Sequence, residues 1–120
     1  MLCKKFAPAL CQDGVYIYAI GGNDSGGGSA INDSQAYNVT MNKWYQLPPL
    51  KESRYSGVAL IFNKKWVYTM IGCANEEDPD VILHRKTIER LDISVRIENA
   101  KSWETLIIPG ISTGNMYKIA

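Results

Sequence analysis

The stretch PALCQDGVYIYAIGG at residues 8–22 recurs without a gap as VALIFNKKWVYTMIG at residues 58–72. Alternation and enrichment in valine, isoleucine and aromatic residues are typical of half-buried strands, and glycine pairs commonly end such strands. A period near 50 is typical of repeat proteins, whose units bury their apolar faces only against neighbouring units. Identical residues stand 50 positions apart at Ala9 and Ala59, Leu10 and Leu60, Tyr18 and Tyr68, and Gly22 and Gly72.

Each repeat predicts four strands. The downstream halves also correspond, since AYN at 36–38 matches RLD at 90–92 and KWYQL at 43–47 matches SWETL at 102–106. The pattern of residues 80–91 is also compatible with a helix. The repeat alignment, however, predicts residues 87–91 as the third strand of the second repeat, so we expect at most a short turn of helix before that strand. The predicted strands are 7–11, 15–20, 34–39 and 44–47 in the first repeat, and 58–62, 66–71, 87–91 and 103–108 in the second.

The residues of the first repeat resemble the kelch repeat. The segment IYAIGG at 17–22, followed by Tyr37 and Trp44, carries the resemblance; in the second repeat Ile71 and Leu91 replace a glycine and the tyrosine. The resemblance implies an all-β fold, with two four-stranded antiparallel kelch-type blades of an incomplete β-propeller. It also implies that Tyr37 and Trp44 pack in the wedge between adjacent blades.

The repeat boundaries predict a first blade over residues 1–54, a second over 55–113, and the start of a possible third repeat at 114–120. Propellers commonly have about four to eight blades. We therefore expect the remaining blades to come from the parent chain or from a neighbouring chain.

Composition argues against several classes of partner. Thirteen basic and twelve acidic residues give a net charge of +1, so no basic excess favours nucleic acid or an anionic membrane. No apolar run approaches the roughly 20 residues of a spanning helix. Cys3, Cys11 and Cys73 are odd in number and form no Cys-x-x-Cys pair, which favours free thiols in a reducing, cytoplasmic compartment and no zinc site.

The motifs that could carry catalysis are incomplete. The glycine-rich segment 21–28 lacks the Gly-Lys-Ser/Thr ending of a phosphate loop, and the acidic segment 76–80 lacks the spacing of a calcium loop. His84 is the only histidine, and no serine or cysteine stands in a nucleophile-elbow sequence. We therefore expect no enzyme, no cofactor and no metal.

Loop residues remain as candidates for binding a protein partner, because loops carry recognition while sheets hold them in place. In kelch proteins, partners commonly dock on the loop after the glycine pair and on the crossing between blades. The acidic second loop favours a mixed or basic partner surface, and Arg54 has an equally weighted structural alternative. The candidate residues are Asn23, Asp24, Ser25, Ser53, Arg54, Tyr55, Asn75, Glu76 and Glu77.

The predicted function is a non-catalytic scaffold for protein–protein interaction. The resemblance suggests two contexts, a substrate receptor of a ubiquitin ligase and a cytoskeletal scaffold, and the residues do not choose between them. The alternatives are a structural subunit of a large assembly and a kelch-type enzyme acting on a sugar.

Overall fold

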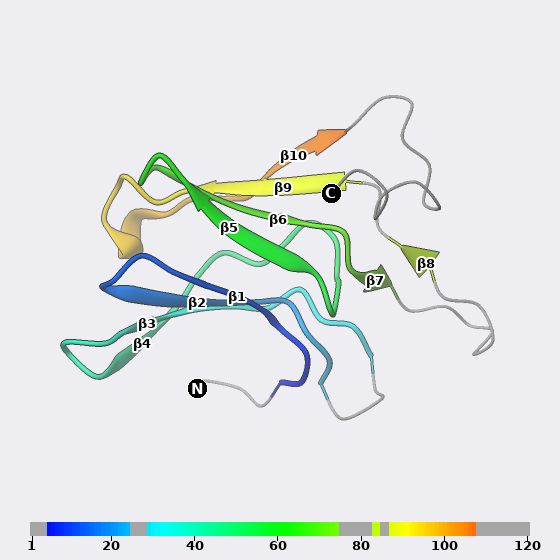
Figure 1. The fold of residues 1–120 in the computed structure, drawn as a ribbon, viewed down its shortest axis with the longest axis horizontal. Helices are drawn as coiled ribbons and strands as arrows, with labels where there is room; N and C mark the ends of the chain where they lie inside the picture. The colour runs from blue at the N-terminus through cyan, green and yellow to red at the C-terminus, as the bar shows by residue number, and fades with distance from the viewer. Residues whose placement is uncertain (1–4, 25–28, 75–82, 85–86, 108–120) are drawn as a thin grey trace.

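A computed structural model of the chain describes residues 5–24, 29–74, 83–84 and 87–107. Within these residues the fold is all-β, with one short 3-10 helix, η1 (Ile97–Asn99), between β9 and β10 (Figure 1). Two four-stranded antiparallel sheets have the orders β1-β2-β3-β4 and β10-β9-β6-β5, and β7 and β8 form a separate hairpin. The strands are β1 (Ala9–Gln12), β2 (Tyr16–Ile20), β3 (Ser34–Asn38), β4 (Lys43–Gln46), β5 (Val58–Phe62), β6 (Trp66–Met70), β7 (Cys73–Ala74), β8 (Leu83–His84), β9 (Thr87–Asp92) and β10 (Glu104–Ile107).

The prediction of two four-stranded antiparallel blades is confirmed. Blade 1 is the sheet of β1 to β4, blade 2 is the sheet of β5, β6, β9 and β10, and in the described part of the chain they do not close into a ring. The turn of helix allowed within 80–91 is not found where the chain is described, because Leu83–His84 and Thr87–Asp92 are strands. Ladders to β6 and β10 on either side hold β9 extended, so tertiary pairing decides its conformation.

The gapless alignment of the two repeats is wrong in the first strand. Ala9 pairs with Ile20 in blade 1, but the residue that takes the same place in blade 2 is Val58, which pairs with Met70. The second strands correspond at a spacing of 50 residues and the first strands at 49, because the turn at residues 63–65 is one residue longer than the turn at 14–15. A one-residue slip moves a side chain to the opposite face of a sheet. Ala59 therefore corresponds to Leu10.

The core lies between the two blades. The inner face of blade 1, which carries Tyr18 and Ile20, packs against the inner face of blade 2, which carries Val67, Leu91 and Trp103. All five side chains are almost fully buried. Such burial stabilises a fold by about 25 cal/mol per Å² of apolar surface, so the contact between blades holds the two sheets together. No helix in the described residues is long and apolar enough to cross a membrane.

Gly21 is fixed in place by close backbone packing. Its φ is +69°, and a Cβ there would lie 2.4 Å from the carbonyl oxygen of Arg54. Ile71 takes the corresponding place in blade 2 with a φ of +61°. The left-handed conformation alone therefore does not require glycine here. Glycine is required because the crossing from blade 1 to blade 2, residues 47–57, passes directly over Gly21.

Replacing Gly21 by alanine is expected to lower the free energy of unfolding by about 2–5 kcal/mol, from backbone strain and overpacking together. Gly14 is the matched control, since its φ is +96° and nothing lies within 4 Å of a built Cβ. Gly14→Ala should cost only the strain, about 1–2 kcal/mol. Urea titrations of both variants measure the two values, and equal losses would contradict the role assigned to the crossing.

Candidate functional site

The loops at one end of the molecule, to the right in Figure 1, form a rim held by main-chain hydrogen bonds. We define the rim as residues 5–7, 21–24, 29–33, 51–56 and 73. Gly22 N donates to Arg54 O (2.8 Å), Ile31 N donates to Gly22 O (2.8 Å), and Arg54 N donates to Ile31 O (3.3 Å). Tyr55 and Cys73 exchange two hydrogen bonds of 3.1 and 2.8 Å. The crossing between the blades is thus tied to both of them.

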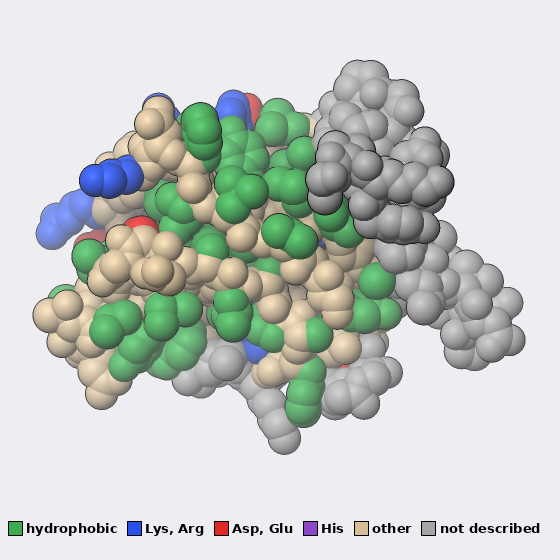
Figure 2. All heavy atoms as spheres, viewed as in Figure 1, with side chains coloured by type: hydrophobic (Ala, Val, Ile, Leu, Met, Phe, Trp, Pro, Cys, Tyr) green, Lys and Arg blue, Asp and Glu red, His purple; other side chains and the backbone are tan. Residues whose placement is uncertain are grey.

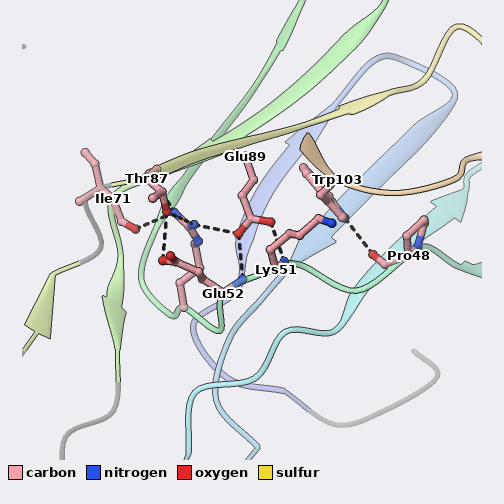
Figure 3. A network of polar contacts seen from close by, with 8 residues as sticks. Pro48, Lys51, Glu52, Ile71, Thr87, Glu89 and Trp103 are labelled. Carbon is pink, nitrogen blue, oxygen red and sulfur yellow. Dashed lines mark hydrogen bonds and ion pairs between the residues drawn. The ribbon is translucent and has the colours of Figure 1, made fainter. Parts of the chain in front are cut away.

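Arg54 lies inside this crossing, with 1% of its surface exposed. Its Nη2 forms an ion pair with Glu89 Oε2 at 2.9 Å, and its Nη1 donates to the main-chain carbonyls of Ile71 (3.2 Å) and Thr87 (3.0 Å) (Figure 3). A side chain buried in this way cannot reach a docked protein. The prediction of Arg54 as a docking residue therefore gives way to its structural alternative.

Glu89 joins the third strand of blade 2 to the crossing. Its carboxylate is fully buried and accepts main-chain hydrogen bonds from Lys51 N (2.6 Å) and Glu52 N (3.2 Å) in addition to the ion pair with Arg54 (Figure 3). A buried carboxylate needs such partners, because desolvation otherwise costs several kcal/mol. Glu89 was not predicted from the sequence, since nothing local marks a strand residue as the partner of Arg54, 35 positions away.

Blade 1 holds a buried cation in the corresponding place. Lys5 stands 49 residues before Arg54, and its Nζ forms an ion pair with Asp33 Oδ2 at 2.8 Å. Gln35, which corresponds to Glu89 by register, donates from Nε2 to Asp33 at 2.6 Å. The acid in blade 1 therefore stands two residues earlier, just before β3, and the buried cation is kept.

The environment of Asp33 favours its charged form. Burial by itself would raise the pKa of this carboxyl, but hydrogen bonds from Lys5, Gln46 and Gln35 outweigh burial and hold the pKa below its usual range. The Asp33 carboxylate in the ion pair with Lys5 is therefore ionised at neutral pH. The ion pair secures the entry to β1 against the loop before β3.

Each buried cation is followed by an aromatic residue on the rim. Phe6 forms an isolated antiparallel β-bridge with Asn23, and Tyr55 forms one with Cys73. The two aromatic residues therefore occupy corresponding places in the two blades. Phe6 is 40% exposed and Tyr55 is half-buried. The next residues, Ala7 (φ 51°) and Ser56 (φ 54°), are left-handed in both blades. Phe6 was not predicted as a site residue. The signal for it is the match of Lys-Phe-Ala at 5–7 to Arg-Tyr-Ser at 54–56, at a spacing of 49 residues rather than 50.

The structure brings part of the predicted docking set together on the rim. Asp24 is exposed, with Oδ1 accepting a hydrogen bond from Ser29 N at 2.8 Å, and Ser53 is half-buried. Asn23 is mostly buried, and its Oδ1 has no hydrogen-bond partner among the described residues. The remaining predicted positions lie outside the described residues: Ser25, Asn75, Glu76 and Glu77.

Reactive groups in the described part of the chain are few. No group of three or more His, Cys, Asp or Glu side chains there could hold a metal ion. Burial, and next the charge of Asp13, raise the pKa of Cys11 to about 12, so this thiol stays protonated at neutral pH. His84 lies in β8, and the predicted third repeat at 114–120 lies outside the described residues.

The four strands of blade 1 lie within a match to a known family. Residues 7–51 match the family model for the Kelch motif. This match supports the kelch-repeat family for the first repeat of the chain. No curated protein matches the chain. The kelch match ends within the crossing, and blade 2 repeats the strand order and pairing of the matched kelch blade.

The kelch aromatic pair lies on the face of blade 1 turned away from blade 2. Tyr37 and Trp44 are cross-strand partners with ring centroids 5.0 Å apart, and both are half-buried. The wedge between the two blades is filled instead by Leu91 and Trp103, which take the same places in blade 2. Trp103 Nε1 donates to Pro48 O at 2.8 Å (Figure 3). Tyr37 and Trp44 therefore do not fill the wedge between these two blades.

Proposed function

We propose that the chain is a non-catalytic scaffold for protein–protein interaction, and that its rim binds the partner. Kelch repeats generally mediate interactions between proteins. The observation that carries the proposal is the matched placement of Phe6 and Tyr55 on a main chain tied to both blades. Because the main chain of the rim is already held in place, docking of a partner requires little further ordering of it. Preorganised surfaces of this kind bind with a smaller entropic cost.

The chemistry of the rim favours a partner of mixed polarity. Aromatic residues supply large contact area with few rotatable bonds, and they are enriched among the residues that dominate binding energy. Around Phe6 and Tyr55 the rim carries an exposed acid, Asp24, and an exposed base, Lys51. Charges of both signs select a partner surface with complementary charges of both signs.

The rim aromatics are expected to control capture of a protein partner. Affinity capture from a lysate, quantified by mass spectrometry, should show at least one protein retained by the wild-type chain and reduced about thirtyfold by Phe6→Ala with Tyr55→Ala, because residues that dominate an interface cost about 2 kcal/mol or more when truncated. The matched control is Val39→Ala with Met41→Ala, at an exposed turn between β3 and β4. Equal loss with both pairs, or no loss with the rim pair, would contradict the proposal.

The identity of the captured protein also separates the two proposed contexts. A ubiquitin-ligase subunit would support a substrate receptor, and a cytoskeletal protein would support a structural scaffold. We further propose a cytoplasmic location, which the odd number of cysteines supports. Turnover of a sugar by the purified chain, or a stoichiometric metal, would overturn the non-catalytic assignment.

A further inference from the structure

Blade 2 presents an apolar outer face. Val58, Leu60 and Phe62 of β5 are 47%, 40% and 59% exposed, and Tyr68 and Met70 of β6 lie beside them, half-buried. A shallow groove of about 300 Å³ runs over this face. Its lining consists of Leu60, Phe62, Tyr68, Met70 and Ile88.

Blade 1 presents an apolar outer face of its own. Leu10 is 61% exposed and Ile17 is 36% exposed, and the register of the sheet places Tyr37 and Trp44 on the same side. Figure 2 shows hydrophobic side chains at the surface over the strands of both sheets. Contiguous apolar surface of this kind commonly marks an interface.

Each outer face corresponds, position for position, to a face that is already buried in this chain. By register, Ile17 and Trp44 of blade 1 take the places of Val67 and Trp103, which are buried against blade 1. The correspondence runs the other way for blade 2, where Leu60, Tyr68 and Met70 take the places of Cys11, Tyr18 and Ile20. The contact between the two blades is therefore a template for a second contact between the two outer faces.

We propose that the outer face of blade 2 in one copy of the chain binds the outer face of blade 1 in a second copy, head to tail. This contact continues the interface that already joins blade 1 to blade 2. On the blade 2 side the contact consists of Leu60, Tyr68 and Met70. On the blade 1 side it consists of Ile17, Tyr37 and Trp44, so both surfaces are largely apolar. The proposal concerns the sheet faces and not the rim, so it is independent of the proposed docking function.

The register places Arg90, Asp92 and Glu104 on the outer face of blade 2, and each has a partner, since Asp92 Oδ1 accepts a hydrogen bond from Ser94 N at 2.8 Å. Arg90 forms an ion pair with Glu104 at 2.8 Å, and its guanidinium carbon lies 4.0 Å from the ring centroid of Trp66. Arg90 therefore already has an ion-pair partner, Glu104, and a stacking partner, Trp66, before the contact forms. A buried charge without such partners would oppose association.

Head-to-tail contacts between unlike faces have a defined consequence for assembly. Such contacts form a ring if the rotation between copies closes, and an open filament if it does not. Since propellers commonly have about four to eight blades, a closed ring built only from the two described blades would need roughly two to four copies.

Sedimentation velocity of the full 120-residue chain over a range of concentrations tests the proposal. The wild-type chain should associate, and Ile17→Asp or Leu60→Asp should each weaken association about tenfold or more, because either variant places an unpaired carboxylate in the contact. Val95→Asp is the matched control, since Val95 is exposed in the segment between β9 and η1, away from both outer faces. It should associate like the wild type.

Mixing the two variants gives the decisive result. The Ile17→Asp chain keeps an intact outer face on blade 2, and the Leu60→Asp chain keeps an intact outer face on blade 1. A mixture should therefore form a one-to-one dimer and nothing larger, which also shows that both variants are folded. A wild-type chain that stays monomeric at every concentration would overturn the proposal. The two outer faces would then be expected to pack against other blades instead. Association of either variant alone at wild-type strength would overturn it too, since a face would then bind its own kind.

Discussion

Replacing Glu89 by alanine is expected to lower the free energy of unfolding by about 3–5 kcal/mol, a large part of the stability of a small domain. The substitution removes the Glu89 carboxylate from the buried Arg54 guanidinium, and it removes the hydrogen bonds that this carboxylate accepts from Lys51 N and Glu52 N. The cost is therefore mainly the desolvation of groups that stay behind. Urea denaturation followed by fluorescence measures the change.

Two further variants show that the loss comes from the buried charge. Glu104→Ala removes an exposed ion pair with Arg90 in the same blade and should cost less than about 1 kcal/mol. Replacing both members of the buried pair, Arg54→Met with Glu89→Leu, should be less destabilising than Glu89→Ala alone, because the buried guanidinium is removed together with the carboxylate. A double variant that is less stable than Glu89→Ala would contradict this account, as would equal effects of Glu89→Ala and Glu104→Ala.

Replacing Trp103 by alanine is expected to cost about 3–5 kcal/mol of unfolding free energy, the range for a fully buried large aromatic side chain. The ring is 1% exposed between the blades, and its Nε1 donates to Pro48 O. Trp103→Phe keeps much of the packing but leaves the carbonyl of Pro48 without this donor. This milder variant should cost about 1–3 kcal/mol.

Trp44 is the matched control, because it takes the same place in blade 1 but lies half-buried on the outer face. At a dilution where the chain is monomeric, Trp44→Ala should cost less than half as much as Trp103→Ala. Thermal and urea denaturation of the two variants test the difference. Equal losses would show that position in the repeat, rather than burial between the blades, sets the contribution of the tryptophan.

Part of the candidate site could be predicted from the sequence. Asp24, Ser53 and Tyr55 lie on the rim, as the resemblance to kelch proteins suggested. Phe6 was missed because it precedes the first strand, where the spacing is 49 residues and a search at 50 finds no match. Arg54 was assigned two roles, and only its contact with Glu89 across 35 residues decided between them.

The sequence by itself determined the eight strands of the two blades and the all-β class, whereas the short hairpin of β7 and β8 was not predicted. Alternation, β-branched and aromatic composition, and terminal glycines act over a few residues, so they are readable in residues 8–22 without knowledge of any partner. The tertiary structure alone decided which face of each strand is buried. In β5 that choice follows from the one extra residue in the turn at 63–65, and in the other strands it follows from which face the neighbouring blade covers. Trp103 is buried because blade 1 covers its face of blade 2, whereas Trp44, in the same place in blade 1, lies on the face turned away from blade 2.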